Sequence, residues 1–219
     1  MSLKSIILSM NYKQINIHFK SIIMKKILLV AVLASFSLVT TAQEEGIRFG
    51  AKAGVNFATI TGDGTDDVDG KTGFHLGAIV EIPISEKFAF QPEILYSSQG
   101  SSEEDGGIDS KLNLNYINIP LMAKYYIAQG LSLQAGPQIG FLASAKSKTE
   151  GDGVEVEIDA DEFIKGIDFG LNFGLGYQLA AGIFFEGRYN LGLSDINDID
   201  GVSEEIKNSV IQLSVGYKF

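Results

Sequence analysis

The sequence predicts an all-β fold, an eight-stranded antiparallel up-and-down transmembrane β-barrel. Three observations lead to this prediction: apolar side chains recur at every second position in eight runs, a secretory leader precedes them, and short and long connections alternate between them. The 219 residues include no cysteine, which excludes a disulfide framework, a thiolate metal site and a cysteine nucleophile.

The amino-terminal part has the pattern of a signal peptide. Residues 24–26 form a cationic start, residues 27–39 are apolar, and small residues lead up to Ala42 and Gln43. The apolar stretch is too short for a membrane-spanning helix, which needs about 20 residues. We therefore expect cleavage between Ala42 and Gln43.

This cleavage divides the sequence into three parts. They are residues 1–23, an over-long start or an extended n-region, residues 24–42, the signal peptide, and residues 43–219, one barrel domain. All five Lys of the first 42 residues leave with the leader, so 12 basic and 27 acidic residues remain. A chain this acidic is a poor partner for nucleic acid.

The first three runs each have one apolar and one polar face. Residues 47–57 alternate aliphatic and aromatic side chains with Arg, Gly, Lys and Asn. Residues 74–82 set Phe, Leu, Ala, Val and Ile against His, Gly, Ile and Glu, and residues 88–99 set Phe, Pro, Ile and Tyr against Gln, Glu and Ser. A period of two is typical of a strand with one buried face.

The fourth run, residues 112–125, changes the parity of its apolar positions midway. A β-bulge near Asn115 or Tyr116 would reconcile its two halves. The fifth run, residues 131–141, returns to a plain alternation of Leu, Ala, Pro, Ile and Phe with Ser, Gln and Gly.

The last three runs complete an even number of strands. Residues 167–179 give the clearest alternation, with apolar side chains opposite Asp, Gly, Asn and Gln, and residues 185–193 place Glu, Arg and Asn opposite Phe, Tyr and Leu. Residues 210–219 alternate up to Phe219. Eight antiparallel strands can close a barrel without a free edge.

The connections predict the orientation in the membrane. The turns at residues 85–87, 128–130 and 180–182 are tight. Long polar connections span residues 61–71, 98–111, 146–165 and 194–207, and they hold 20 of the 27 acidic residues. Outer-membrane barrels have short periplasmic turns and longer external loops, so we expect an outer-membrane protein with an acidic outer surface.

The aromatic residues fall near the ends of the runs, as expected of girdles at two lipid interfaces. The alternative is a soluble sandwich or lipocalin-type barrel, whose strands also alternate. The polar face here is rich in Gly and poor in charge for a surface in water, and the chain has no Trp. These features favour the membrane barrel.

Several segments resemble the PorT-type outer-membrane β-barrel domain family over residues 44–219. They are residues 50–57, the Pro92-Glu93 pair, residues 119–121, 135–137 and 170–176, and Arg188-Tyr189-Asn190. The resemblance implies a small eight-stranded barrel, usually of unassigned activity. PorT itself is associated with a secretion system for surface proteins, a role of one subset that no residue here marks.

The alternation also predicts the contents of the lumen. Four cationic and four anionic side chains point inward, and they are Arg48, Lys52, Glu81, Glu93, Lys124, Asp168, Glu186 and Arg188. An eight-stranded barrel is just wide enough to be filled by side chains, so we expect an ion-pair network that plugs it, with inward glycines making room. A narrow gated path is the alternative.

Other sites are weaker. His75, the one histidine after residue 42, could serve as a general base, but no second motif supports catalysis, and a member of a polar network is the simpler interpretation. The loops at residues 62–70 and 195–201 are rich in Asp, yet neither has the ligand order of an EF-hand. We therefore expect no enzyme activity, cofactor or dedicated metal site, although divalent ions could bridge these loops to lipopolysaccharide phosphates.

Tyr217 and Phe219 share the lipid-facing side of the last run. A terminal aromatic resembles the signal by which barrel-assembly machinery recognises its clients; a girdle role is the alternative, and both can hold. Two function classes remain. One is a structural or surface-interaction protein whose acidic loops meet lipid, lipopolysaccharide or surface proteins. The other is a transport or secretion component, either a narrow channel or an accessory of an export complex.

Overall fold

The computed structural model describes residues 46–62, 64–65, 69–105, 108–151, 154–199, 201–202 and 204–219. The predicted signal peptide and its cleavage site at Ala42 and Gln43 lie outside the described residues. The strands are β1 (Arg48–Gly62), β2 (Asp69–Pro83), β3 (Phe88–Asp105), β4 (Ile108–Ala128), β5 (Leu131–Gly151), β6 (Val154–Asp159), β7 (Ile167–Gln178), β8 (Ile183–Gly192) and β9 (Ile206–Lys218), with one 3-10 helix, η2 (Asp161–Phe163). Within the described part, no helix is long and apolar enough to span a membrane.

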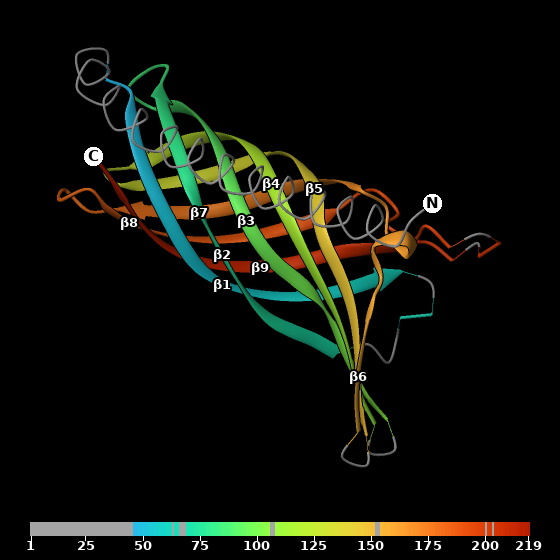
Figure 1. Cartoon of the computed structure of the whole chain (residues 1–219). Coiled ribbons are helices and arrows are strands. Elements are labelled where there is room, and N and C mark those ends of the chain that lie inside the picture. The colour runs from blue at the N-terminus through green and yellow to red at the C-terminus, as the bar shows by residue number, and fades with distance from the viewer. Residues whose placement is uncertain are drawn as a thin grey trace, which may run out of the picture. The chain divides into compact units, whose positions relative to one another are not determined.

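Eight of the strands close into a ring (Figure 1). The order is β4-β3-β2-β1-β9-β8-β7-β5, every pairing is antiparallel, and β4 pairs with β5 to close the circle. β6 pairs with β5 alone and lies outside the ring. The structure therefore confirms the eight-stranded up-and-down barrel.

The two faces of each strand have opposite chemistry. Outward side chains are large and apolar yet half-exposed; Phe74 is 49% and Leu213 52% exposed. Inward side chains are mostly polar and nearly all buried, as Gln91 and Asn172 at 0% illustrate. A protein dissolved in water would hide the first set and expose the second, whereas lipid hydrocarbon favours the arrangement observed.

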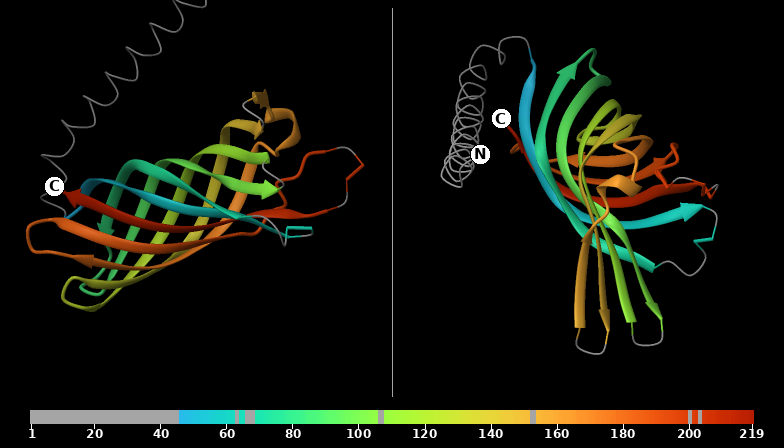
Figure 2. Two further views of the ribbon diagram at one scale, coloured as in Figure 1. Left: turned by 90° about the horizontal axis from the view of Figure 1, so that it is seen from below. Right: turned by 45° about the vertical axis from the view of Figure 1, so that its right-hand side comes forward.

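The tight turns meet at one end of the ring, which we call the short-turn end, and we call the opposite end the long-loop end (Figure 2). Two of the connections that the sequence predicts to be long polar loops are largely strand. Residues 98–105 extend β3 and residues 108–111 extend β4, and these extensions pair with each other. Residues 146–151 extend β5, and residues 154–159 form β6 beside them. The prediction was wrong because the high charge of these segments suggested loop, although strand pairing satisfies their backbone groups beyond the barrel.

The register of β4 and β5 shifts between Asn115 and Tyr116, but the prediction of a bulge in β4 that reconciles its two halves is wrong. The extra residue belongs to β5, because Asn115 pairs with Ser144 and Tyr116 with Leu142. β4 itself keeps one parity, and Leu114 and Tyr116 are both fully buried. The apolar residues of β4 change parity along the sequence because those near the long-loop end point into an apolar part of the lumen, whereas those nearer the short-turn end point outward.

Candidate functional site in the barrel lumen

A buried ion-pair cluster lies inside the lumen. Arg188, on β8, donates two hydrogen bonds to Glu93, on β3, with Nη1–Oε2 and Nη2–Oε1 distances of 2.9 and 2.8 Å. The Nζ of Lys52, on β1, lies 2.8 Å from Glu93 and 3.1 Å from Glu186. All four side chains are at most 1% exposed. Inward positions of distant strands thus supply both signs of charge to one dry site.

A second group of charges lies toward the short-turn end. The Oε2 atom of Glu81 is 2.5 Å from Lys218 Nζ and 3.2 Å from Lys124 Nζ, and Tyr126 donates its hydroxyl proton to the same atom at 2.8 Å. Arg48 lies at the rim, where its side chain is 45% exposed, and its Nη1 atom is 3.7 Å from the other carboxylate oxygen of Glu81, Oε1. Lys124 is also 3.7 Å from Glu186, which links the two groups.

The predicted set of eight is therefore only partly brought together. Asp168 stands apart, because its carboxylate accepts hydrogen bonds from Ser194 and Asn208 and has no cationic partner among the described residues. Lys218 joins the cluster and was missed. The signal that could have found it is the parity of β9, since Tyr217 and Phe219 face outward and Lys218 must then face inward.

Amides and one histidine fill the middle of the lumen. The Nδ1 atom of His75 lies 2.7 Å from Asn56 Oδ1, and Nε2 lies 2.8 Å from Ser214 Oγ. The order of hydroxyl, imidazole and amide matches that of a nucleophile, its base and an orienting group. Ser214 is only 8% exposed, however, and His75 is 1% exposed, so a substrate has no access. This geometry favours a structural network.

Glycine supplies the room that these side chains need. A Cβ atom on Gly176 would lie 2.4 Å from Gln134 Nε2, so the side chain of Gln134 uses the space that Gly176 leaves. At Gly54 and Gly77 the nearest neighbour is the backbone of an adjacent strand, 2.0 Å from such a Cβ atom. These glycines therefore let strands approach closely inside a narrow barrel.

Apolar side chains close the long-loop end. Ile164, just after η2, and Ile196, after β8, are 7% and 0% exposed, and they pack in one cluster with Leu114 and Tyr116 of β4. The two segments are joined because Lys165 donates its backbone N–H to the carbonyl of Ile196 at 2.9 Å. From the short-turn end to the long-loop end, the lumen is thus filled first by charged groups and then by amides. Last comes the apolar cluster of Ile164, Ile196, Leu114 and Tyr116, which we call the apolar lid.

Asp195 holds the segment of this lid in place. Its carboxylate accepts a hydrogen bond from Lys165 Nζ and others from the backbone N–H groups of Asn197 and Ile206. The hydrogen bond from Lys165 is the main cause that holds the pKa of Asp195 below its ordinary value. Because the folded pKa is depressed, the stabilisation is present above the unfolded value of about 3.9 and is lost as the pH falls through the lower folded pKa.

We expect the Asp195→Asn substitution to make residues 194–206 a faster target for limited proteolysis at neutral pH, because the ion pair and part of the backbone capping are lost. In the unaltered protein, cleavage of the same segment should accelerate only below about pH 4. Asp198→Asn is the matched control, since it removes the same charge from the same loop. Equal cleavage of the two variants would contradict this role of Asp195.

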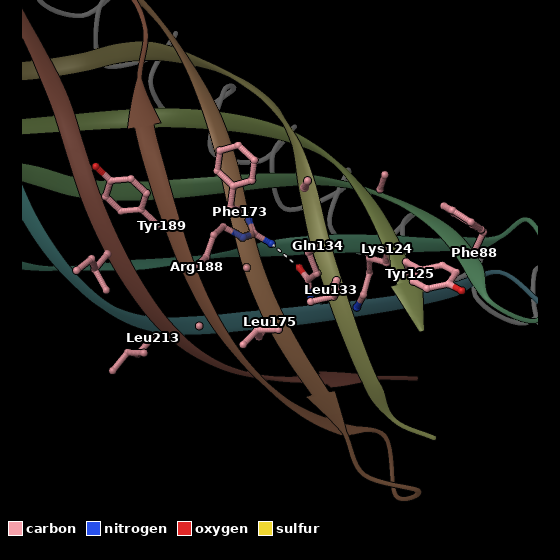
Figure 3. Close-up of a pocket in the computed structure, with 15 residues that line it drawn as sticks. Phe88, Lys124, Tyr125, Leu133, Gln134, Phe173, Leu175, Arg188, Tyr189 and Leu213 are labelled. Atoms are coloured by element: carbon pink, nitrogen blue, oxygen red, sulfur yellow. Dashed lines mark hydrogen bonds between the residues drawn. The ribbon is translucent and has the colours of Figure 1, made fainter. Parts of the chain in front are cut away.

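Figure 3 shows a hollow that crosses β4, β5, β7, β8 and β9. Outward-facing apolar side chains such as Phe173, Leu175 and Leu213 form most of its lining, and each is about half exposed. The hydrogen-bonded pair Gln134 and Arg188, drawn with a dashed line, is buried beneath them. This hollow is part of the lipid-facing surface, and the charged side chains of Lys124 and Arg188 beneath it are only 3% and 1% exposed.

Within the described ranges, no group of three or more His, Asp or Glu side chains could hold a metal ion. The predicted acidic loop at residues 62–70 lies partly outside those ranges.

At the short-turn end, Tyr217 and Phe219 are both exposed on the outward face, with ring centroids 5.2 Å apart, and the Phe219 N–H donates to the carbonyl of Phe49. This contact places the chain end beside β1.

An eight-strand ring with an apolar outer belt and a polar, filled interior defines the class of small membrane-spanning β-barrels. The model of the family described as "Outer membrane protein beta-barrel domain" matches residues 41–198. The chain belongs to this family, and it is an integral protein of the outer membrane.

Solved structures of similar fold come from several bacteria. The neisserial surface protein A is 13% identical, with a TM-score of 0.50 and coverage of 78% of this chain and 97% of that chain. The attachment invasion locus protein Ail of Yersinia pestis is 17% identical, with a TM-score of 0.48 and coverage of 78% and 98%. At such identities a likeness speaks for the fold alone. No curated protein sequence matches the chain.

Proposed function

We propose that the protein is a non-enzymatic surface-interaction protein, in which a closed barrel anchors an acidic, strand-built structure at the outer face of the membrane. The observation that carries this proposal is the filled lumen. Ion pairs, amides and the apolar lid leave no open passage among the described residues, so the regions available to partners are the lipid-facing belt and the two ends.

The long-loop end has the features of a contact surface. β3, β4, β5 and β6 continue past the ring as a four-stranded sheet, which keeps its shape through backbone pairing. Its residues are mainly acidic or hydroxylated. We propose cationic surface proteins as its partners, together with lipid and lipopolysaccharide, whose phosphates divalent ions could bridge to the carboxylates.

Trimming this sheet tests the proposal. In the variant, short turns replace residues 103–110 and 147–158, so that the Ser102–Lys111 and Lys146–Asp159 pairs form the new hairpin ends. We expect cells that display the trimmed protein to lose attachment to cationic beads and to neighbouring cells, while the amount of heat-modifiable barrel stays unchanged. Undiminished attachment at equal barrel content would overturn the proposal.

The second candidate is a transport or secretion component of the PorT type, for which the order of the sequence segments at residues 50–57, 119–121 and 170–176 is the specific support. A channel version is disfavoured by the ion pairs of Glu93 and Glu186 across the lumen. Conductance in planar bilayers tests the channel version, and co-purification with an export complex tests the accessory version.

We also propose that Tyr217 and Phe219 guide assembly of the barrel. The exposed aromatic pair next to β1 supports a role in recognition by barrel-assembly machinery. Deleting Phe219 should lower the yield of folded protein in the outer membrane, while refolding of the purified chain in detergent stays nearly unchanged. Replacing Phe185, which is 50% exposed on the same face, by Ala is the control. Equal yields for the two variants and the parent would count against the assembly role.

A further inference from the structure

The outer edge of β6 is unpaired among the residues that the structure describes. Along the ring, β5 pairs with β7 up to Phe141, and β7 in turn pairs with β8. Beyond Leu142, β6 takes the place of β7 beside β5, but β8 has already ended at Gly192. Figure 2 shows the β5–β6 pair projecting from the ring. Within the described ranges, no strand lies where β8 would continue, so β6 is an open edge.

This edge has the composition of a strand that can accept another. All six side chains of β6 are exposed, and the strand contains neither Gly nor Pro. Val154, Val156 and Ile158 lie on one face and are 62%, 53% and 53% exposed. The other face carries Glu155, Glu157 and Asp159. Alternate backbone N–H and C=O groups point away from β5, and in the described part of the chain they have no ladder partner.

The paired edge of β6 shows which side chains suit it. Lys146 and Lys148 of β5 lie on the same side of the sheet as the carboxylates of β6. Their Nζ atoms are 2.5 Å from the Glu157 carboxylate and 2.9 Å from the Glu155 carboxylate, respectively. These contacts raise the pKa of both lysines. On the apolar face, Ser147 pairs with Ile158 and Thr149 with Val156. A strand with cations on one face therefore complements β6.

The carboxylates exceed the cations that β5 supplies. Glu150 lies across from Glu155, so two carboxylates meet there in the register. Two copies of β6 paired antiparallel with full overlap would set Glu155 opposite Ile158, and likewise each other carboxylate opposite an aliphatic side chain, so no carboxylate would gain a cation. A shift of one residue would set the carboxylates opposite each other, and like charges directly opposite destabilise a sheet. A second copy of this chain is therefore a poor occupant, and a basic strand is a good one.

We propose that β6 is a docking edge for an extended basic segment of a partner protein, in which Lys or Arg alternates with aliphatic residues. The segment adds one strand to the sheet: backbone hydrogen bonds supply affinity, its cations meet Glu155, Glu157 and Asp159, and its aliphatic side chains cover Val154, Val156 and Ile158. This inference rests on the proposed surface-interaction function and names the class of partner.

The test uses the full-length protein in lipid nanodiscs and a blocked hexapeptide of alternating Lys and Val. We expect saturable binding in a titration, weakened by salt, because exposed ion pairs are screened. Residue-resolved hydrogen exchange should show new protection at alternate amides of β6. A peptide of the same composition with three Lys followed by three Val is the control, since it cannot keep its charges on one face. Equal binding of the two peptides, or no protection in β6, would overturn the proposal.

A pair of charge-reversal variants sharpens the test. Glu155→Lys with Glu157→Lys should weaken binding of the alternating peptide about tenfold, the effect of losing two exposed ion pairs. The control replaces Glu103 and Glu104 by Lys; both residues lie on β3, at the opposite edge of the same sheet from β6. If Glu155→Lys with Glu157→Lys unfolds the β5–β6 hairpin, the hydrogen exchange of β6 amides in the unaltered protein still decides whether the peptide binds there.

Failure of this proposal differs from failure of the proposed function. If cells lose attachment when the sheet is trimmed but the alternating peptide does not bind β6, the surface role holds and the edge carboxylates serve only to prevent strand pairing. If trimming has no effect on attachment, the proposed function itself fails.

Discussion

Replacing Glu93 by Gln should lower the free energy of unfolding by about 3–5 kcal/mol, because the change leaves buried cations without their partner. Glu93 accepts both Nη hydrogen bonds of Arg188 and lies 2.8 Å from Lys52 Nζ. After the substitution, Glu186 alone faces these two cations. The measurement is urea unfolding in lipid vesicles, followed by circular dichroism because the chain has no Trp.

Two further variants show whether the cause is unpaired charge. Glu103→Gln removes an exposed carboxylate from the same strand and should change stability by less than about 0.5 kcal/mol. Combining Glu93→Leu with Arg188→Met removes both partners, and the pair should recover much of the lost stability, as apolar replacements of buried ion pairs do. If the protein with Glu93→Gln alone is as stable as the parent, the buried ion-pair cluster has no structural role.

The Gly54→Ala substitution should destabilise the barrel by about 3 kcal/mol or more, since one methyl group has no space. The added Cβ atom would lie 2.0 Å from the carbonyl oxygen of Leu213 and 2.7 Å from the ring of His75. Strands β1 and β9 would have to separate, and the contacts of His75 with Asn56 and Ser214 would change. The same unfolding experiment, with the yield of refolded barrel, measures the effect.

Gly187→Ala is the matched control. Gly187 lies on the outward face of β8, where the nearest atom to an added Cβ is Leu213 Cδ2 at 3.8 Å, an ordinary contact. We expect this variant to fold like the parent. If the two alanine variants are equally stable, the close approach of β1 and β9 at Gly54 is not a constraint on the fold.

The ring and the facing of its side chains could be predicted from sequence because both depend on one local property, the alternation of polar and apolar residues. Alternation places Lys52, Glu93 and Arg188 in the lumen, as the structure has them. It cannot give their heights along the barrel axis, which depend on the stagger between neighbouring strands. For that reason Asp168 was grouped with charges that it does not meet.

The apolar lid could not be predicted, because it brings together residues from separate connections. Ile164 and Ile196 each stand in acidic, irregular sequence with no period, and only tertiary packing against Leu114 and Tyr116 gives them a role. β6 is a different case. Its six residues alternate as clearly as any other strand, but their carboxylates were interpreted as loop composition.

The length of β5 has a consequence for how far the protein reaches. β5 has 21 residues, and a tilted strand needs about 9–11 of them to cross the hydrocarbon layer. The remaining residues, at about 3.3 Å each, extend roughly 35 Å farther along the same strand. β6 is therefore held at the far end of a strand that also forms part of the barrel wall, beyond the hydrocarbon layer.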